Sequence, residues 1–334
     1  MAARIKDIAR DLGVSSMTVS KALRNQYDIS EETRERVQKR ARQLGYQPNL
    51  VARSLVTKRS YIVGLVIPDL MHSFFAEVAT AAARKLGPRG YHVIIANSNE
   101  NAEFEMREIE TLLARKVDGL IIASAQKNGR WLSRAMRTSG VPYVLIDRAL
   151  TGLTAPYVGV DDAKVGALAT GHLVEQGCRR IAHIKGPSIS TGYGRLRGYR
   201  RALAQHGLKA LPEYVVSGQH QDTTGQQAMR ELLGLKPPPD GVFCYNDPVA
   251  AGAIQAVLES GLNVPNDVKI IGAGNVHYSN LLRVPLSTVD QGSSAIGETA
   301  AEKLLDCIGA KAPCPPEHIL IPLRLVVRES SRRK

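Results

Sequence analysis

Hydrophobic residues recur at helical spacing in three short segments near the N-terminus. The first segment places its apolar side chains on one helix face, at Ile5, Ile8, Ala9 and Leu12. Gly13 follows, and glycine ends helices well because it adopts positive φ without steric strain. The next two segments supply the expected core positions Val19, Ala22, Leu23, Val37, Ala41 and Leu44. The pattern predicts three short helices, over about 5–12, 16–23 and 31–44, packed into one small unit.

Polar residues stand where the second and third helices should begin. Ser15 is the expected N-cap of the second helix, with Val14 and Val19 placed to form a hydrophobic staple. Ser30 is the expected cap of the third helix, and two glutamates follow it at the positive end of the helix dipole. These residues fix the helix starts independently of the hydrophobic spacing.

The turn between the first two helices is tight, which is typical of a helix-turn-helix. In that motif the second helix enters the major groove and its early residues touch base edges. Ser16 can donate or accept a hydrogen bond, Met17 can contact a thymine methyl, and Lys21 can reach guanine O6 or N7. The expected DNA-facing residues of this unit are Ser16, Met17, Thr18, Lys21 and Asn25. The alternative is an ordinary three-helix bundle with a solvated polar face.

From Tyr61 onward the pattern changes to apolar strands that alternate with helices of a dozen or so residues. The strand candidates lie at 61–67, 91–96, 119–123, 143–147, 157–160, 180–185, 241–245, 268–272 and 286–289. Near-continuous apolar strands of this kind predict parallel sheets covered on both faces. Because this region is too long for one open sheet, we expect two doubly wound lobes with a ligand cleft between them.

The charge distribution separates the two regions further. The chain carries a net charge of +13, and its first 60 residues hold 13 Lys and Arg against 6 Asp and Glu, a net +7. More than half of the excess therefore lies in under a fifth of the chain. A basic unit of this size usually meets a polyanion, and nucleic acid is the first candidate. The alternative is a well-solvated basic surface without a partner.

The cysteines and the apolar runs bear on the compartment. The four cysteines form no CxxC pair, and we expect reduced, mostly buried thiols. A disulfide between Cys307 and Cys314 is not expected, because reducing compartments disfavour it. No apolar run approaches the roughly 20 residues that span a bilayer, and the N-terminus lacks a signal peptide's apolar stretch. We expect a cytoplasmic protein without a membrane partner.

Strand–helix alternation is also typical of nucleotide-binding enzymes, but their motifs are missing from this sequence. Pro68 follows the first strand instead of a GxGxxG loop, and residues 192–198 carry glycines at the unrelated spacing GxGxxxG. The sequence contains no GxxxxGK[ST], GxSxG or HExxH. The histidines show no metal-ligand spacing, and we expect His172 and His183 to be surface or core residues. The sequence predicts no enzyme, no cofactor and no metal site.

Four motifs, in this order, resemble the lactose/purine/galactose repressor (LacI/GalR) family. They are IKDIA at 5–9, VSSMTVS at 14–20, GYQPN at 45–49 and VARSL at 51–55. The resemblance implies an N-terminal all-α helix-turn-helix head and hinge helix, then an α/β periplasmic-binding-protein-like domain of two doubly wound parallel-sheet lobes. It implies a DNA-binding domain at 1–47, a hinge helix or linker at 48–59, and an effector-binding and dimerisation domain at 60–334.

The resemblance also implies that the chain crosses between the lobes three times, near Asp161, Gln291 and Pro322. One lobe would then comprise about 61–160 and 292–321. The other lobe would comprise about 162–290 and 323–330.

The segment after Pro48 is expected to be a conditional helix. Residues 49–56 can form about two helical turns, and a lone helix this short is marginal in water. By resemblance, bound DNA and the same segment of a second subunit hold it. Leu55 matches the family's minor-groove wedge, which kinks the duplex, and Arg53 matches a neighbouring backbone or groove contact. The alternative is a flexible tether without base contacts.

The resemblance places an effector between the lobes, at strand ends where open α/β sheets bind ligands. Phe74 or Phe75 can stack on a ring, and the alternative is that both are core residues of the next helix. Arg195 matches the family's ligand-gripping arginine, since a guanidinium can donate two parallel hydrogen bonds to vicinal hydroxyls or a carboxylate. Asn246 and Asp247 resemble a polar pair for sugar hydroxyls, although Asp247 fits a helix N-cap equally well. Weaker cleft candidates are Asp147, Asp161, His220 and Gln291.

One position departs from the family pattern. Gly274 stands where the family usually carries an aspartate that anchors a ligand hydroxyl or ring nitrogen. Its absence leaves more room and one acceptor fewer, so the ligand is bulkier, less polar at that point, or acidic and drawn to Arg195. Asn275 can substitute in part. No specific sugar or purine is implied.

These observations predict a sequence-specific DNA-binding transcription regulator, and we expect it to act as a repressor. We expect a homodimer or a dimer of dimers on a near-palindromic operator, controlled by a sugar-like small-molecule effector in the inter-lobe cleft. The alternative is a periplasmic-type sugar-binding protein without catalytic activity. Such a protein would carry a signal peptide and lack the basic head.

Overall fold

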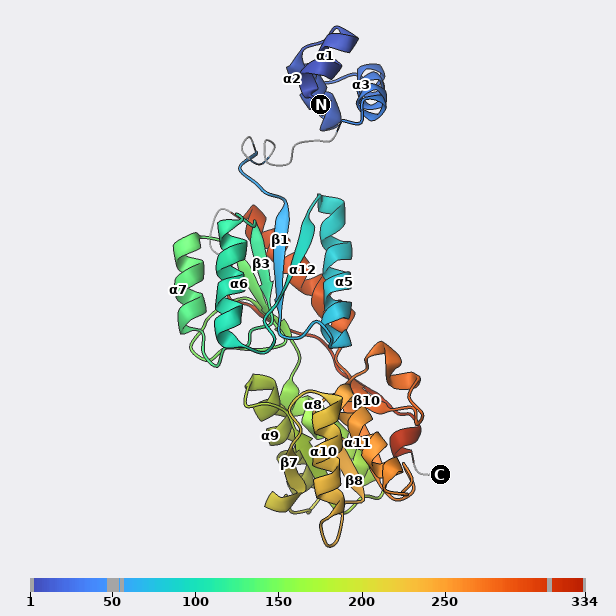
Figure 1. Ribbon diagram of the computed structural model, residues 1–334. Coiled ribbons are helices and arrows are strands. Elements are labelled where there is room, and N and C mark those ends of the chain that lie inside the picture. Colours follow the sequence, from blue (N-terminus) through green and yellow to red (C-terminus); the bar gives the residue numbers. More distant parts are fainter. Residues whose placement is uncertain (1–2, 47–53, 55–56, 311–313, 333–334) are drawn as a thin grey trace. The chain divides into compact units, whose positions relative to one another are not determined.

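The computed structural model describes residues 3–46, 54, 57–310 and 314–332 (Figure 1). Their contacts divide the chain into two compact units, residues 1–60 and 61–334, and each unit is described by itself. The first unit is helical and the second contains two parallel sheets. No described helix is long and apolar enough to cross a bilayer.

The first unit contains the three helices that the hydrophobic spacing predicts. They are α1 (Ile5–Leu12), α2 (Ser16–Leu23) and α3 (Glu31–Gln43). Gly13 follows α1 with a φ of 65°, and the Ser15 hydroxyl accepts a hydrogen bond from the Thr18 backbone N–H at 3.0 Å. The Ser30 hydroxyl likewise accepts from the Thr33 N–H at 3.4 Å. The predicted helix starts and the first helix end are therefore confirmed.

A small apolar core holds these helices together. Its buried members are Ile8, Ala9, Val19, Ala22, Val37 and Ala41. Val14, Leu23 and Leu44 pack against this core while remaining half-buried. The contact between Val14 and the cluster that contains Val19 agrees with the predicted hydrophobic staple.

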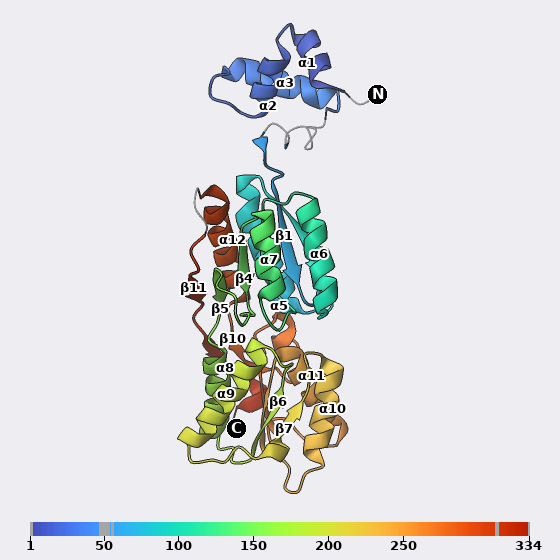
Figure 2. The same ribbon diagram turned by 90° about the vertical axis from the view of Figure 1, so that its left-hand side faces the viewer.

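The second unit begins with a six-stranded sheet whose neighbouring strands are all parallel. Its strands, in spatial order, are β11 (His318–Leu320), β5 (Tyr157–Gly159), β4 (Tyr143–Ile146), β3 (Gly119–Ile122), β1 (Ile62–Ile67) and β2 (His92–Asn97). The helices that cover it are α5 (Ser73–Leu86), α6 (Ala102–Ala114), α7 (Arg130–Ser139) and α12 (Ser293–Gly309). Figure 2 shows α6 and α7 on one face of this sheet, with α5 and α12 on the other. We call this part lobe 1.

A second six-stranded sheet repeats this order. Its strands are β12 (Arg324–Val326), β10 (Ser287–Asp290), β9 (Lys269–Gly274), β8 (Gly241–Cys244), β6 (Ile181–Lys185) and β7 (Val215–Ser217). Only β12 runs antiparallel to its neighbour. The helices α8 (Asp162–Glu175) and α9 (Ser190–Gln205) pack together on one face, and α10 (Asp222–Leu233) and α11 (Asp247–Glu259) pack on the other. We call this part lobe 2.

The chain passes between the two sheets three times. It leaves lobe 1 after β5, returns between β10 and α12, and enters lobe 2 again between β11 and β12. All nine strands that the sequence predicts are present. Three further strands, β7, β11 and β12, have three residues each and were missed. Short 3-10 turns lie at Gly87–Arg89, Pro212–Tyr214, His277–Asn280 and Glu329–Ser331.

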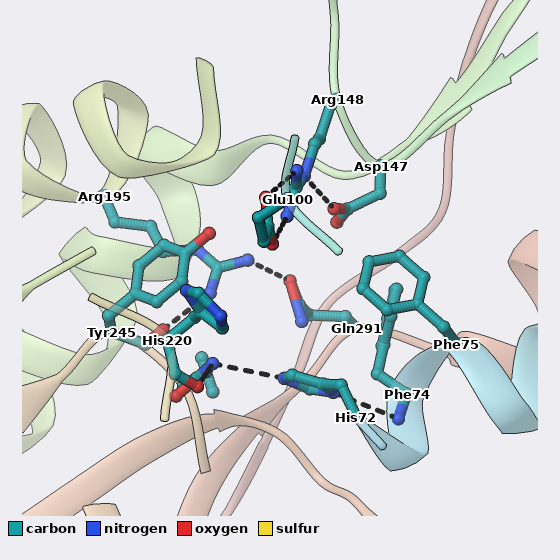
Figure 3. A pocket seen from close by; sticks show the side chains of 12 residues that line it. His72, Phe74, Phe75, Glu100, Asp147, Arg148, Arg195, His220, Tyr245 and Gln291 are labelled. Atoms are coloured by element: carbon teal, nitrogen blue, oxygen red, sulfur yellow. Dashed lines mark hydrogen bonds and ion pairs between the residues drawn. The ribbon is translucent and has the colours of Figure 1, made fainter. Parts of the chain in front are cut away.

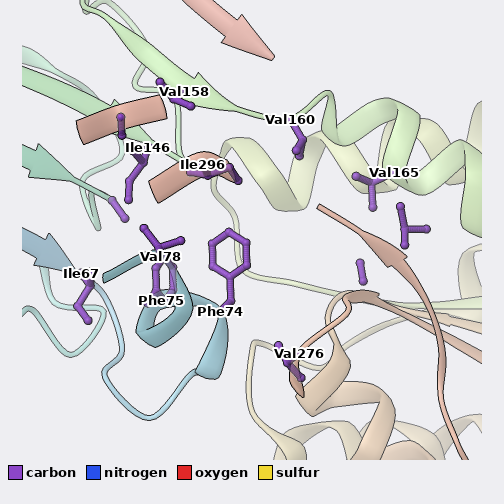
Figure 4. Close-up of a cluster of buried hydrophobic side chains, with 14 of the residues drawn as sticks. Ile67, Phe74, Phe75, Val78, Ile146, Val158, Val160, Val165, Val276 and Ile296 are labelled. Carbon is purple, nitrogen blue, oxygen red and sulfur yellow. The ribbon is translucent and has the colours of Figure 1, made fainter. Parts of the chain in front are cut away.

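One buried apolar cluster continues from lobe 1 into lobe 2. Phe74 and Phe75 lie at the start of α5 and are 3% and 4% exposed. Figure 4 shows their rings among side chains of the β1, β4 and α12 region, with Val276 of lobe 2 nearby. Both phenylalanines are therefore buried in the core, and both also line a cavity between the lobes.

The glycines at 192–198 serve helix packing. A Cβ at Gly194 would lie 2.5 Å from the Asp162 Cβ, and one at Gly198 would lie 2.0 Å from the Ala163 carbonyl oxygen. Both positions therefore require glycine for α9 to approach α8 this closely. The close approach brings Arg195 of α9 next to Asp162 of α8.

The structure corrects the expectation for two of the cysteines. Cys307, in the last turn of α12, forms a disulfide with Cys314, and their Cα atoms are 5.1 Å apart. The sequence argument allowed that these two cysteines could meet in space, but it gave more weight to a reducing compartment. Cys178 and Cys244 are buried free thiols, and burial raises the pKa of Cys178 to about 11.

Candidate functional site

The outer surface of α2 carries the predicted DNA-facing residues. Ser16 is exposed, and the Met17 side chain is 63% exposed, so both are available to a groove. Thr18 is half-buried, and its hydroxyl is hydrogen-bonded to the Ser15 hydroxyl at 2.9 Å. These contacts involve the start of α2, whereas Ser16 and Met17 remain exposed to solvent.

Two further predicted residues follow along the same surface. Lys21 forms an ion pair with Asp28, and this hydrogen bond lowers the pKa of the Asp28 carboxyl. Asn25 follows α2 with a φ of 53°, and its side-chain oxygen accepts a hydrogen bond from Gln38 Nε2 at 3.0 Å. Tyr27, which the sequence argument did not include, is 99% exposed. Arg53 and Leu55 lie outside the described residues.

A second candidate site is a cavity between lobe 1 and lobe 2 (Figure 3). Its volume is about 30 Å³, roughly enough for two water molecules. The lining residues are His72, Phe74, Phe75, Glu100, Asp147, Arg148, Arg195, His220, Tyr245, Asn246, Ala273 and Gln291. Seven of the predicted effector contacts are among them: Phe74, Phe75, Asp147, Arg195, His220, Asn246 and Gln291.

Arg195 reaches this cavity from α9 with all three of its donor nitrogens engaged. Its Nε donates to the Asp162 carboxylate at 3.0 Å, its Nη1 to the Tyr245 carbonyl at 2.6 Å, and its Nη2 to Gln291 Oε1 at 2.5 Å. Its guanidinium carbon also lies 4.6 Å from the centre of the Tyr245 ring. Burial alone would lower the pKa of Arg195, but the Asp162 carboxylate raises it, so the guanidinium stays charged. Burial raises the pKa of Asp162 to about 6.

A second arginine approaches the cavity from lobe 1. Arg148 donates to both carboxylate oxygens of Glu100, at 2.7 and 2.6 Å, and its Nε lies 3.6 Å from an Asp147 oxygen. Burial would raise the pKa of Glu100, but the bond to Arg148 lowers it below its usual value. Burial raises the pKa of Asp147, against the opposing effect of Arg148. Asp147 has a φ of 59°, which turns the chain at the end of β4.

A histidine of lobe 1 and an asparagine of lobe 2 lie within hydrogen-bonding distance in the lining of the cavity. Asn246 caps α11 by accepting from the Val249 N–H at 3.0 Å, and its Nδ2 donates to the His220 carbonyl at 3.0 Å. The same Nδ2 lies 3.1 Å from His72 Nε2. Burial lowers the pKa of His72 to about 4, so the ring is neutral near pH 7.

Three other residues that the sequence predicted for the effector cleft form hydrogen bonds away from the cavity. Asp247 is fully buried and accepts hydrogen bonds from the Val276 N–H, the Ser279 hydroxyl and the Thr288 hydroxyl, at 3.0, 2.7 and 2.6 Å. It is neither a cavity residue nor the N-cap of α11, which is Asn246. The Asn275 side chain bonds to Asp290 and Arg328, at 3.2 and 2.8 Å. The third, Asp161, caps α8 by accepting from the Ala163 and Lys164 N–H groups.

Gly274 has a φ of 137°, a conformation that residues with a Cβ rarely adopt. The backbone at this point is therefore suited to glycine. The neighbouring Ala273 lines the cavity instead.

Four polar or aromatic lining residues were missed from the sequence: His72, Glu100, Arg148 and Tyr245. Three of them follow directly or closely after β2, β4 and β8, and His72 follows β1. Open sheets bind ligands at the carboxyl ends of parallel strands. The predicted strand ends alone could therefore have identified these four residues as candidates. No group of three or more potential metal ligands is present among the residues that the structure describes.

Two family models and several known repressors match the chain. A family model described as periplasmic binding proteins and sugar binding domain of the LacI family matches residues 60–329. A model described as bacterial regulatory proteins, lacI family, matches residues 4–49. The ribose operon repressor of Halalkalibacterium halodurans is 33% identical over 98% of this chain and 97% of its own length. The HTH-type transcriptional repressor PurR of Escherichia coli O139:H28 is 33% identical over 98% of this chain and 96% of its own length.

Solved structures agree with these matches. A Lac repressor dimer bound to operator and the anti-inducer ONPF has a TM-score of 0.88 at 26% identity, over all of both chains. A complex of the transcriptional regulator CelR with cellobiose has a TM-score of 0.75 at 30% identity, over 98% of this chain and 99% of that one.

Proposed function

The chain belongs to the lacI family of bacterial regulatory proteins, and from that premise we propose that it represses transcription under the control of a small effector. It binds operator DNA as a dimer through its head, and the effector binds between the lobes. The observation that carries the proposal is the presence, in one chain, of a helix-turn-helix with an exposed α2 surface and a polar cavity between two lobes. Its place of action is the cytoplasm, where the DNA is.

The α2 surface supports direct reading of bases. Ser16 and Met17 are the most outward side chains of its first turn, and they differ in chemistry, one hydrogen-bonding and one apolar. Lys21 is held by Asp28, and this pair must rearrange for the ammonium to reach a guanine. Ser16 and Met17 are therefore expected to determine which bases are preferred. Lys21 is expected to contribute mainly to the affinity for DNA.

The cavity supports a polar ligand with a ring. Two carboxylates and two guanidinium groups provide acceptors and donors for hydroxyls, while Phe74, Phe75 and Tyr245 provide apolar and aromatic surface. Each charged group is paired within the site, so a neutral polyhydroxyl ligand can exchange with these pairs without leaving a buried charge. At about 30 Å³ the cavity is too small for a sugar, so the lobes or their loops must part on binding.

In vitro operator selection with the full-length protein tests the DNA half. We expect the selected sites to be near-palindromic, with half-sites about one helical turn apart, because each half is read by one head of a two-fold dimer. Met17→Ala should change the base preferred at one position per half-site. Met71→Ala is the matched control, since Met71 is 89% exposed on lobe 1 and should leave the preference unaltered. Footprinting that shows a single unpaired half-site contradicts the dimer proposal.

The competing function is a sugar-binding protein that never contacts DNA. This function would be favoured if the same selection enriches no DNA sequence although circular dichroism shows that the protein is folded.

A further inference from the structure

The Cys307–Cys314 disulfide borders a cavity at the amino ends of the strands of lobe 1. This cavity has a volume of about 720 Å³, and both cysteines line it together with Tyr143, the first residue of β4, and Pro156, which precedes β5. The cavity between the lobes lies at the opposite edge of the same sheet, because Asp147 in its lining follows the carboxyl end of β4. The two linings have no described residue in common. The disulfide is therefore separate from the proposed effector site.

Small molecules can reach the two sulfur atoms from this cavity. Cys314 is half-buried, and Cys307 is 7% exposed. The volume of the cavity lies within the range of about 300–1,000 Å³ that is typical of small-molecule sites. Arg137 also lines the cavity, and its positive charge favours the thiolate form of a cysteine. A small thiol or disulfide of the size of glutathione can therefore enter and react.

The two cysteines are spaced for reversible oxidation. Their Cα atoms are 5.1 Å apart, within the span of about 4.4–6.8 Å that disulfides require, so the bond can close without moving the backbone. The proposed place of action is the cytoplasm, where disulfides are usually transient and redox-sensing instead of structural. Cys307 and Cys314 therefore fit a redox pair better than a permanent cross-link.

A short chain of contacts leads from the disulfide to the first strand of the second unit. Leu304 lies one turn before Cys307, and a Cβ at Gly119, the first residue of β3, would lie 2.8 Å from its side chain. The preceding Asp118 accepts a hydrogen bond from the Tyr61 backbone N–H at 2.9 Å. Tyr61 begins the second unit and stands directly before β1. The last turn of α12 therefore contacts the part of lobe 1 that receives the chain from the head and linker.

We propose that Cys307 and Cys314 form a redox pair that is modified by exchange with a small disulfide of the glutathione class, and that closing the pair strengthens operator binding. The operator part of this proposal rests on the proposed function. The closed bond restricts the last turn of α12 and, through Leu304, the start of β1. If operator binding orders the same region, it loses less conformational freedom when the bond is already closed, so the two events favour each other.

The exchange proceeds in two steps. The thiolate of one cysteine attacks a sulfur of the small disulfide, whose S–S bond breaks and releases one small thiolate. The second cysteine then attacks the protein-bound sulfur of this mixed disulfide, which forms the Cys307–Cys314 bond and releases the other small thiolate. Two electrons pass from the pair to the small disulfide, and the two thiol protons of the pair end on the two released thiolates.

The test uses the full-length protein in glutathione buffers that range from mostly thiol to mostly disulfide. Alkylation followed by mass spectrometry measures the closed fraction of the pair, and fluorescence anisotropy of operator DNA from the selection experiment measures binding in the same buffers. We expect the pair to pass from open to closed across the series, and operator affinity to rise at least about fivefold with it. Hydrogen exchange of the amides of residues 61–67 should slow as the pair closes.

Two serine variants and one control complete the experiment. Cys307→Ser and Cys314→Ser should each make operator affinity independent of the buffer. Cys178→Ser should retain the response, because Cys178 is a buried free thiol of lobe 2.

Three results would each overturn the proposal: a pair that stays open or stays closed in every buffer, operator affinities of the two forms within about twofold of each other, or a response that persists in both serine variants. If no operator sequence is enriched, the proposed function fails. Equal hydrogen exchange in the open and closed forms then overturns the redox pair independently.

Discussion

In the proposed effector site, Arg195 joins α8, the residue after β8 and the β10–α12 crossover through three hydrogen bonds. A lysine retains the charge beside Asp162, but its single ammonium cannot reach all three acceptors. We expect Arg195→Lys to weaken effector binding by roughly 10- to 100-fold, since hydrogen bonds to charged groups contribute about 1.5–3 kcal/mol. Calorimetry with an effector identified by ligand screening measures this change.

Arg197→Lys is the matched control for this substitution. Arg197 is exposed on the same helix and does not line the cavity. Unchanged effector affinity in Arg195→Lys, with its fold intact, would remove Arg195 from the binding site.

His183 gives the molecule a predictable response to acid. Its ring is stacked between Phe243 and Tyr199, at centroid distances of 4.5 and 5.3 Å, and burial lowers its pKa from 6.5 to about 4. The unfolded chain therefore takes up this proton first as pH falls, so its contribution to stability is complete above about pH 6.5 and is lost toward pH 4. The loss amounts to roughly 3 kcal/mol over that window.

The measurement is the free energy of unfolding in urea at pH 7 and pH 5. His72 has a similarly lowered pKa and contributes to the same acid slope. His183→Phe retains the stacked ring without the titrating group, so its unfolding free energy should change less with pH than that of the parent protein. His206→Gln, at an exposed position, should keep the parent slope. Equal slopes in His183→Phe and the parent would contradict the assignment.

Side chains at the cavity could be predicted to different degrees. Arg195, Asn246 and Gln291 were identified by resemblance, and they do line the cavity. Asp247 was not placed correctly, because the neighbouring Asn246 takes the N-cap and turns Asp247 toward three buried donors. Periodicity alone does not reveal which of two adjacent polar residues caps a helix.

At the scale of elements, the last turn of α12 carries a disulfide that the sequence argument rejected. Cys307 and Cys314 close a loop with a sequence separation of 7, and the chain-entropy relation gives about 2.5 kcal/mol for such a loop. Titration in denaturant without reductant should find two reactive thiols, from Cys178 and Cys244. Cys307→Ser should raise that number to three by freeing Cys314. Four thiols in the unreduced parent protein would contradict the disulfide.

The segment that carries Arg53 and Leu55 is the second element with a direct test. Leu55→Ala should reduce operator affinity mainly by removing the DNA kink, because an inserted apolar wedge unstacks a base step. Arg53→Ala should also lower the slope of log affinity against log salt by roughly 1. Gel mobility of circularly permuted operator fragments measures the bend. Lys116→Ala, in the second unit, is the charge control for the salt slope, and an unchanged bend in Leu55→Ala would eliminate the wedge.

Most elements could be predicted because their signals are local. Apolar runs mark the nine predicted strands, and caps such as Ser15 mark helix starts. The three missed strands have three residues each, and two of them, β11 and β12, carry few buried side chains. Their pairing with β5 and β10 comes from the chain's return between the lobes, a non-local effect that hydrophobic spacing does not contain.

At the scale of the whole molecule, repression and effector binding are two equilibria of one chain. An effector alters operator binding only if it binds two arrangements of the lobes with different affinity. The small cavity between the lobes and the hydrogen bond from the Ala149 N–H to the Ser190 hydroxyl are features of a closed arrangement of the two lobes. A ligand that needs more room favours a different one, so binding and closure are coupled.

This coupling has to be reciprocal. If an effector changes operator affinity by a given factor, the operator must change effector affinity by the same factor, typically between 5- and 150-fold. Calorimetry of the effector against the free protein and against the protein–operator complex measures one factor, and fluorescence anisotropy of labelled operator with and without effector measures the other. We expect the two factors to agree and to fall together toward unity in Arg195→Lys at equal effector occupancy. An effector that binds between the lobes with the same affinity whether or not operator is present would show that this site does not control the head.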